Sequence, residues 1–118
     1  MIATRPAHTS ELRPAERQFL ETLRTLGFGR IEHLQVRDGE IVLDPRPTIV
    51  RELKLGAPQW TPVEPKEAEY ELKREAADFF EFVRSVECGE IRALEVRRGL
   101  PSLMHTLAAD PRGGGRRG

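Results

Sequence analysis

Residues 11–39 read ELRPAERQFLETLRTLGFGRIEHLQVRDG, and residues 71–99 read ELKREAADFFEFVRSVECGEIRALEVRRG. Aligned with a constant offset of 60 residues and no gap, eleven of these 29 positions are identical. The agreement runs through a helix pattern, a turn and a strand pattern, so chance similarity between two unrelated units is a poor explanation. A match at a fixed period is the sequence signature of a repeat. The sequence therefore predicts a tandem duplication of one structural unit.

Each unit opens with a segment whose apolar residues recur at three- and four-residue steps, the spacing of one face of an α-helix. Phe19 in the first unit and Phe79 in the second belong to these faces. Pro14 is compatible with a helix only if the helix begins close to it. In the second unit, Thr61–Glu64 has the spacing of a capping box with proline at the first helical position. This pattern predicts a helix start there or shortly after.

A β-hairpin is expected after each helix, because residues 30–37 and 90–97 are rich in Ile, Leu and Val. Asp38-Gly39 is a strong signal for a two-residue type I′ turn, and Arg98-Gly99 takes the same place in the second unit with weaker turn chemistry. The expected return strands are residues 40–44 and 100–107.

Three details of the strands carry expectations of their own. The alternation of apolar residues breaks at the same place in both units, which predicts a bulge near residues 32–33 and near 92–93. Pro101 cannot donate a ladder hydrogen bond, so its strand is expected at a sheet edge. Residues 48–55 form a further strand pattern without a counterpart in the second unit. This extra strand should pack against the core or against a second copy of the chain.

One helix and one hairpin bury too little apolar surface to fold reliably alone, so the two units should share one core. The predicted fold is α+β, a tandem helix-hairpin (αββ) repeat with two helices on one face of a mainly antiparallel sheet. Phe19 and Phe79 are expected at equivalent buried sites. The expected organisation is a flexible N-terminal arm at 1–9, a single domain at 10–107 with repeats 10–55 and 61–107 joined by a linker at 56–60, and a disordered Arg/Gly tail at 108–118.

The segment LRTLGFGRIEHLQVRDGEIVL at 23–43, followed by IVRELKL at 49–55, resembles the YezD-like family of small bacterial proteins of unknown function. Residues 71–107 would be a diverged second copy, in which Arg98 replaces the aspartate of the turn. The resemblance implies a helix-hairpin unit and a bacterial source, and it implies no activity, catalytic residue or cofactor. The residues that match the family pattern are Gly29, Ile31, Val36, Asp38, Gly39 and Arg51.

Composition narrows the functional classes. The chain has 118 residues, and 19 Lys+Arg balance 19 Asp+Glu, which is unlike a strongly basic nucleic-acid binder. No apolar run approaches the roughly 18 residues of a membrane span. The first residues lack the apolar core of a secretory signal. The sequence therefore predicts a soluble, cytoplasmic protein.

Groups that could perform chemistry are few. No phosphate-binding loop, nucleophile elbow or zinc-protease motif occurs in the sequence. His8, His33 and His105 stand in three unrelated contexts without metal-ligand spacing. Cys88 aligns with Phe28 and is expected to be buried and inert. We therefore predict no catalytic residue, no cofactor and no metal site.

The expected function is a non-enzymatic interaction or regulatory module with an unidentified protein partner, a possible homodimer through residues 48–55, and no membrane partner. Trp60, the sole tryptophan, should fasten the linker to the core or act as an exposed anchor for a partner.

The alternative function is a weak nucleic-acid-binding accessory protein, which is possible but not favoured. The tail RGGGRRG at 112–118 would contribute a salt-sensitive attraction. A continuous positive stripe on the folded surface would support this alternative, and mixed charge would argue against it. The possible nucleic-acid contacts are Arg30, Arg37, Arg97, Arg98, Arg112, Arg116 and Arg117.

Overall fold

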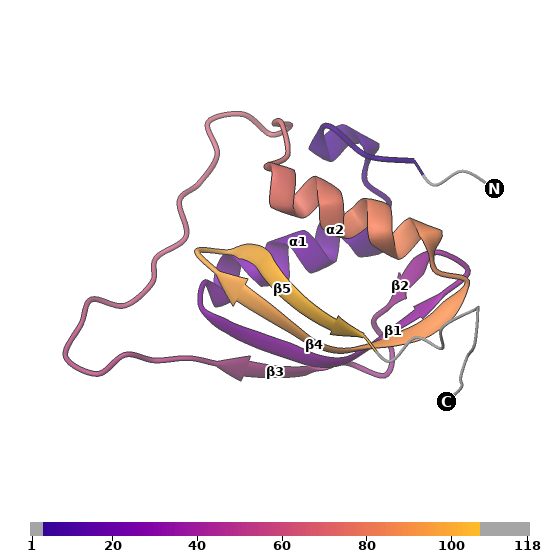
Figure 1. Ribbon diagram of the computed structural model, residues 1–118. Helices are drawn as coiled ribbons and strands as arrows, with labels where there is room; N and C mark the ends of the chain where they lie inside the picture. The colour runs from indigo at the N-terminus through magenta and orange to yellow at the C-terminus, as the bar shows by residue number, and fades with distance from the viewer. Residues whose placement is uncertain (1–3, 107–118) are drawn as a thin grey trace.

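The computed structural model describes residues 4–106 as two helices packed on one face of a five-stranded antiparallel sheet (Figure 1). The predicted α+β class is confirmed. Within the described residues, no helix combines the length and apolar character needed to cross a bilayer. In chain order the elements are the 3-10 helix η1 (Thr9–Glu11), α1 (Pro14–Leu26), β1 (Gly29–Arg37), β2 (Glu40–Val42), β3 (Thr48–Arg51), α2 (Arg74–Ser85), β4 (Cys88–Arg97) and β5 (Leu100–Thr106).

The centre of the sheet is the antiparallel pair β1–β4. β2 and β3 both pair with the edge of β1 that faces away from β4, at opposite ends of that edge. β5 alone pairs with the edge of β4 that faces away from β1. The prediction that residues 48–55 have no counterpart is therefore wrong, because β3 pairs with β1 as the later part of β5 pairs with β4. β3 also ends at Arg51, whereas the expected strand extended to residue 55. Residues 43–47 interrupt the edge, where Pro45 and Pro47 supply no N–H to a ladder.

The register of β1 and β4 relates the two halves of the chain. Gly29 pairs with Val96, and Val36 pairs with Gly89. A shift of 60 residues exchanges these two pairs, so residues that match in the sequence alignment occupy equivalent places on the two central strands. This is the arrangement that a local twofold relation requires, and the duplication itself stays a prediction.

The break in apolar alternation has a local cause in each unit. In β4 the register with β5 shifts between Ile91 and Ala93, which confirms the predicted bulge there. In β1, His33 takes a positive φ of 62°, an uncommon conformation for a residue other than glycine. This local reversal lets Ile31 and Leu34 both point to the buried face.

The two hairpin turns have the predicted type I′ signs. Asp38 and Gly39 have φ values of 54° and 73°, and Arg98 and Gly99 have φ values of 54° and 75°. Pro101 lies on β5, which is the outer strand at its side of the sheet, as predicted. The weaker turn chemistry at Arg98 thus forms the same backbone as Asp38.

The helix starts differ in how well the sequence predicts them. α1 begins at Pro14, as expected. α2 begins at Arg74, so the start expected at Thr61–Glu64 is wrong. The glutamate of that capping-box pattern precedes Pro65, and a residue before proline is disfavoured in the α conformation. Residues 52–73 therefore form a long connection between β3 and α2 that holds no helix or strand.

The expectation of a flexible arm at residues 1–9 is also wrong for residues 4–9, the part that the structure describes. Thr9 is buried, and its backbone N–H donates to the carbonyl oxygen of Tyr70 at 2.9 Å. The N–H of Leu72 donates to the carbonyl oxygen of Ala7 at 2.9 Å. The early chain is held by backbone pairing with the end of the connection, a long-range contact that local sequence patterns do not reveal.

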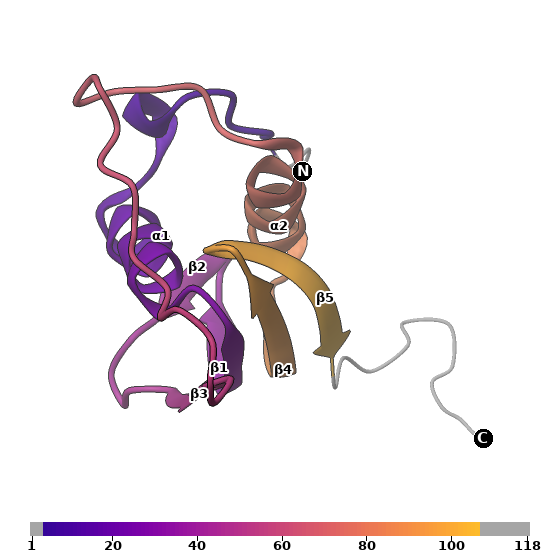
Figure 2. The same ribbon diagram turned by 90° about the vertical axis from the view of Figure 1, so that its left-hand side faces the viewer.

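The core lies between the helices and the sheet, and the opposite sheet face is open (Figure 2). Phe19 on α1 and Phe79 on α2 are both buried, which confirms their predicted burial. Their rings stack with centroids 5.4 Å apart and planes 20° apart. The two helices therefore meet through the same aromatic position of each unit.

Candidate functional site

Trp60 fastens the connection to the core. This connection, residues 52–73, replaces the short linker expected at 56–60 (Figure 1). The indole Nε1–H of Trp60 donates to the carbonyl oxygen of Arg24 at 2.7 Å, and its ring meets Phe28 edge to face with centroids 5.6 Å apart. The structure therefore supports the first role considered for Trp60, which is to fasten the linker to the core.

Two cavities lie beside Trp60. The larger, of about 530 Å³, is bordered by Phe28, Arg51 and the connection. The second, of about 290 Å³, lies between the end of α1, the start of α2 and the β4–β5 turn, and we refer to it as the α1–α2 cavity. Its volume is near the lower limit for small-molecule sites. The apolar side chains that line it include Leu20, Trp60, Pro62, Tyr70, Leu72 and Leu100.

A buried ion pair joins the start of α1 to the end of α2. Arg84 Nε donates to Glu16 Oε2 at 2.9 Å, and Arg84 Nη2 donates to Glu16 Oε1 at 2.7 Å. The side chains of Arg84 and Glu16 are 6% and 1% exposed. Two parallel bonds of this kind are the strongest geometry for an arginine and a carboxylate. The backbone N–H of Arg13 also donates to Glu16 at 2.9 Å, which caps α1.

Arg84 also holds the early chain in place. Its Nη1 donates to Thr4 Oγ1 at 2.7 Å, and its Nη2 donates to the carbonyl oxygen of Glu11 at 3.0 Å. The hydrogen bonds to Glu16 raise the pKa of Arg84 further above its usual value. One guanidinium therefore links α2, α1 and the segment that precedes α1.

Glu69 fixes the far end of the connection. Its carboxylate accepts a hydrogen bond from Thr9 Oγ1 at 2.6 Å and from Arg17 Nη2 at 3.0 Å. The hydrogen bond from Thr9, followed by that from Arg17, lowers the pKa of Glu69 below its usual value of 4.5. The ionised carboxylate is thus the form that stabilises this contact.

Glu69→Gln is expected to destabilise the protein at neutral pH and to have less effect in acid. Because the pKa of Glu69 is lower in the folded state, its contribution to stability is fully present above the unfolded pKa and is lost as pH falls through the folded pKa. Urea unfolding of wild type and variant at about pH 7 and about pH 3 measures this. Glu67→Gln, on the same segment, is the control. An equal difference at both pH values would contradict the assignment.

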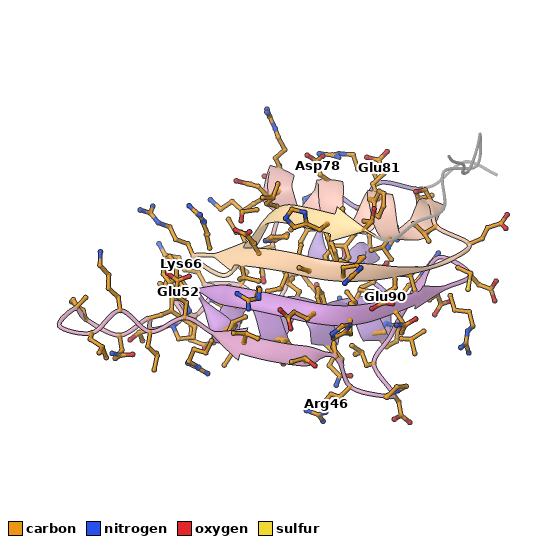
Figure 3. The ribbon with its side chains drawn as sticks, turned by 60° about the horizontal axis from the view of Figure 1, so that its bottom comes forward. Arg46, Glu52, Lys66, Asp78, Glu81 and Glu90 are labelled. Carbon is orange, nitrogen blue, oxygen red and sulfur yellow. The ribbon has the colours of Figure 1, made fainter. Side chains whose placement is uncertain are left out.

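The open face of the sheet carries charges of both signs (Figure 3). Arg30 Nε lies 2.6 Å from Glu32 Oε2, and His33 Nδ1 lies 2.9 Å from Glu90 Oε2. The hydrogen bond from Arg30 lowers the pKa of Glu32, and that from His33 lowers the pKa of Glu90. These pairs occupy the face on which nucleic-acid contacts were expected.

Of the strand arginines proposed for nucleic-acid binding, Arg30 and Arg97 lie near one end of the β1–β4 pair and Arg37 lies at the other. Arg37 and Arg97 are exposed at the ends of β1 and β4, and Arg97 lies 4.0 Å from Glu95. Arg98 lines the α1–α2 cavity instead. Acidic side chains separate the strand arginines, so the charge on this face is mixed. Arg112, Arg116, Arg117 and the predicted tail at 108–118 lie outside the described residues.

The candidate chemical groups lie apart. His8 precedes η1, His33 lies on the open sheet face and His105 lies on β5. In the described part of the chain, no three His, Cys, Asp or Glu residues gather as metal ligands. Cys88 is exposed, so its predicted burial is wrong. It pairs with Arg37 in the sheet register, and paired residues share a face, here the solvent face.

Sequence reasoning did not identify three side chains that shape these sites, namely Glu16, Arg24 and Arg84. Arg24 and Arg84 match at the 60-residue offset, whereas Glu16 matches Ala76. The sequence signal for these residues is that the arginine is present in both units, whereas the acid is present in only one. This signal can be interpreted only when the structure shows that each arginine lies against the helix start of the other unit.

The likeness of residues 23–55 to the YezD-like family stays a prediction, since comparison of the chain with family models, with curated proteins and with solved structures finds no match.

Proposed function

We propose that this protein is a non-enzymatic interaction module that binds a protein partner through the connection and the adjoining strand β3. The observation that carries this proposal is a set of large apolar side chains left exposed there, with Leu55 90% exposed. We call this set the connection surface. It consists of Ile49, Leu53, Leu55 and Val63.

Exposed apolar side chains gathered on one segment mark interaction sites, because burying each against a partner is favourable by about 1.5–3 kcal/mol. The connection extends beyond the end of the sheet, where a partner can reach it (Figure 1). Pro58 and Pro62 restrict its backbone, and Trp60 anchors it. A segment restricted in this way loses less conformational entropy on binding.

The titratable groups support a binding role over a catalytic one. Among residues 4–106, the side chains with clearly shifted pKa values are engaged in ion pairs or hydrogen bonds with one another. Catalytic groups with shifted pKa values usually gather around a cleft. The side chains concerned are Arg5, Arg30, Glu32, Glu69, Arg84 and Glu90.

The double variant Leu53→Ser/Leu55→Ser is expected to lose the partner that wild type retains in affinity purification from native cells. The matched control is Leu103→Ser on β5, because Leu103 is 53% exposed and Leu53 is 55% exposed. The control should retain the partner at the wild-type level. The proposed contact element is refuted if wild type does not self-associate and the double variant captures the partner as well as wild type does.

A second copy of the chain is the first partner to test. Sedimentation velocity of wild type at high micromolar concentration shows whether a dimer forms. A wild-type dimer that the double variant turns into a monomer, and that Leu103→Ser leaves intact, identifies the connection surface as a homodimer contact. A wild-type monomer assigns the surface to another protein, as tested above.

A further inference from the structure

The α1–α2 cavity is the structural counterpart of the Glu16–Arg84 ion pair. A Cβ added to Gly39 would lie 2.9 Å from the Arg84 carbonyl oxygen, and a Cβ added to Gly99 would lie 3.2 Å from the Arg24 Cα. A shift of 60 residues converts the first contact into the second. Each helix end therefore packs against the hairpin turn of the other unit, and Arg24 occupies the place of Arg84.

The two counterpart sites differ in one respect, the carboxylate. At the Arg84 end, the third residue of α1 is Glu16, whose carboxylate accepts hydrogen bonds from Arg84 and from the N–H of Arg13. At the Arg24 end, the third residue of α2 is Ala76, which lines the α1–α2 cavity. Ala76 therefore supplies no carboxylate at this position.

The donors around this position have no acid at the third residue of α2, and Arg24 pairs instead with Glu21 on its own helix. Lys73 takes the place of Arg13 at the start of α2, and no side chain among residues 4–106 caps it. The side chain of Arg24 is 17% exposed, and its guanidinium donates to Glu21 and to the carbonyl oxygen of Val63, each at 2.7 Å. A guanidinium has five N–H donors, so these contacts leave further donors for a ligand.

The lining of the cavity is apolar with positive charge only. Three basic residues, Arg24, Lys73 and Arg98, belong to the lining, and no acidic residue does. Glu21, the acid that pairs with Arg24, lies outside the lining and is 64% exposed. An apolar wall with a few converging polar groups is the usual composition of a small-molecule site.

We infer that the α1–α2 cavity binds a small monocarboxylate with a short apolar body. The carboxylate takes the position that Glu16 occupies at the counterpart site, near Arg24 and the N–H of Lys73, and the charged side chains of Lys73 and Arg98 in the lining attract it. The apolar body lies against Leu20, Tyr70 and Leu72. Of the connection surface, Val63 also lines this cavity, whereas Ile49, Leu53 and Leu55 do not, so the double variant Leu53→Ser/Leu55→Ser leaves the cavity lining intact.

Octanoate is the probe, and octanol is the uncharged control. Trp60 is the sole tryptophan and lines both cavities, so its fluorescence reports occupancy, and the variants at Ala76 assign the signal to the α1–α2 cavity. Octanoate should bind saturably and raise the melting temperature. Octanol should bind at least about ten-fold more weakly, because it cannot accept charge-assisted hydrogen bonds. Equal binding of octanoate and octanol would overturn the assignment of a carboxylate site.

Ala76→Glu tests the same position without a ligand. The new carboxylate should reach the place that Glu16 holds at the counterpart site, raise the melting temperature above that of Ala76→Gln, and abolish the fluorescence response to octanoate. Ala76→Gln is the control, since it fills the same space without charge. If Ala76→Glu binds octanoate as wild type does, or is no more stable than Ala76→Gln, the inference is wrong.

If neither variant at Ala76 folds, a double variant that removes two positive charges from the cavity lining tests the site instead. Lys73→Gln/Arg98→Gln should weaken octanoate binding by about ten-fold. Arg46→Gln/Lys66→Gln removes the same charge at residues outside the cavity lining (Figure 3), and should bind octanoate as wild type does. Equal affinity in the two double variants would also overturn the inference.

Discussion

Arg84→Met is expected to lower the free energy of unfolding by about 3–5 kcal/mol, because it leaves the Glu16 carboxylate without its charge partner in a buried site. Glu16 is 1% exposed, so water cannot replace the guanidinium without opening the structure. Domains of this size have a total stability of about 5–15 kcal/mol, so the loss is a large fraction of the whole. Urea unfolding followed by circular dichroism measures it.

Two further variants separate the buried charge from side-chain packing. Arg84→Met/Glu16→Leu removes both charges and should recover much of the loss, because an apolar pair of similar volume is often as stable as a buried ion pair. Arg30→Met, whose partner Glu32 lies on the open sheet face, should have little effect. A double variant as unstable as Arg84→Met would show that the unpaired carboxylate is not the cause.

Phe79→Ala is expected to destabilise the protein by about 3–5 kcal/mol, and Phe19→Ala by a similar amount. Both rings are buried and stack on each other between the helices and the sheet, so truncation of either leaves a cavity in the core. Phe82→Ala, at a half-buried position of α2, should cost clearly less. Thermal and urea unfolding of the three variants test the ranking.

The stack itself is measured by a double-mutant cycle. Because Phe19 and Phe79 touch, the cost of removing both should differ from the sum of the single costs by about 0.5–1.5 kcal/mol. Strict additivity would mean that the two rings contribute independently, and that the helices are held together by their separate contacts with the sheet.

The parts of the fold that follow from short-range patterns were predictable. Apolar periodicity identified both helices, and the Asp38-Gly39 signal located a hairpin turn that the structure confirms at φ 54° and 73°. The equivalent turn at Arg98-Gly99 was predictable only from its match to the first unit. For the helices and the first turn, the information lies within a few residues along the chain.

The errors arise where distant segments decide the structure. The order of residues 4–9 is one such case, because the early chain pairs with Tyr70 and Leu72 across the molecule. The α2 start is a local exception, since Pro65 follows the expected capping box. The exposure of Cys88 depends on its register against β1. The α1–α2 cavity is formed by three elements whose approach no local pattern encodes, so its position could not be predicted.

The central β1–β4 pair has a consequence for the continuity of the chain. Because the halves on either side of the connection share this pair of strands and the stacked phenylalanines, a chain cleaved near residues 55–56 should persist as a complex of two fragments. Its melting temperature would then depend on concentration, as for any assembly of separate chains. For folding, the connection would then act by keeping the local concentration of each half high for the other. Separately expressed fragments should accordingly reconstitute the native circular dichroism spectrum when mixed in equal amounts.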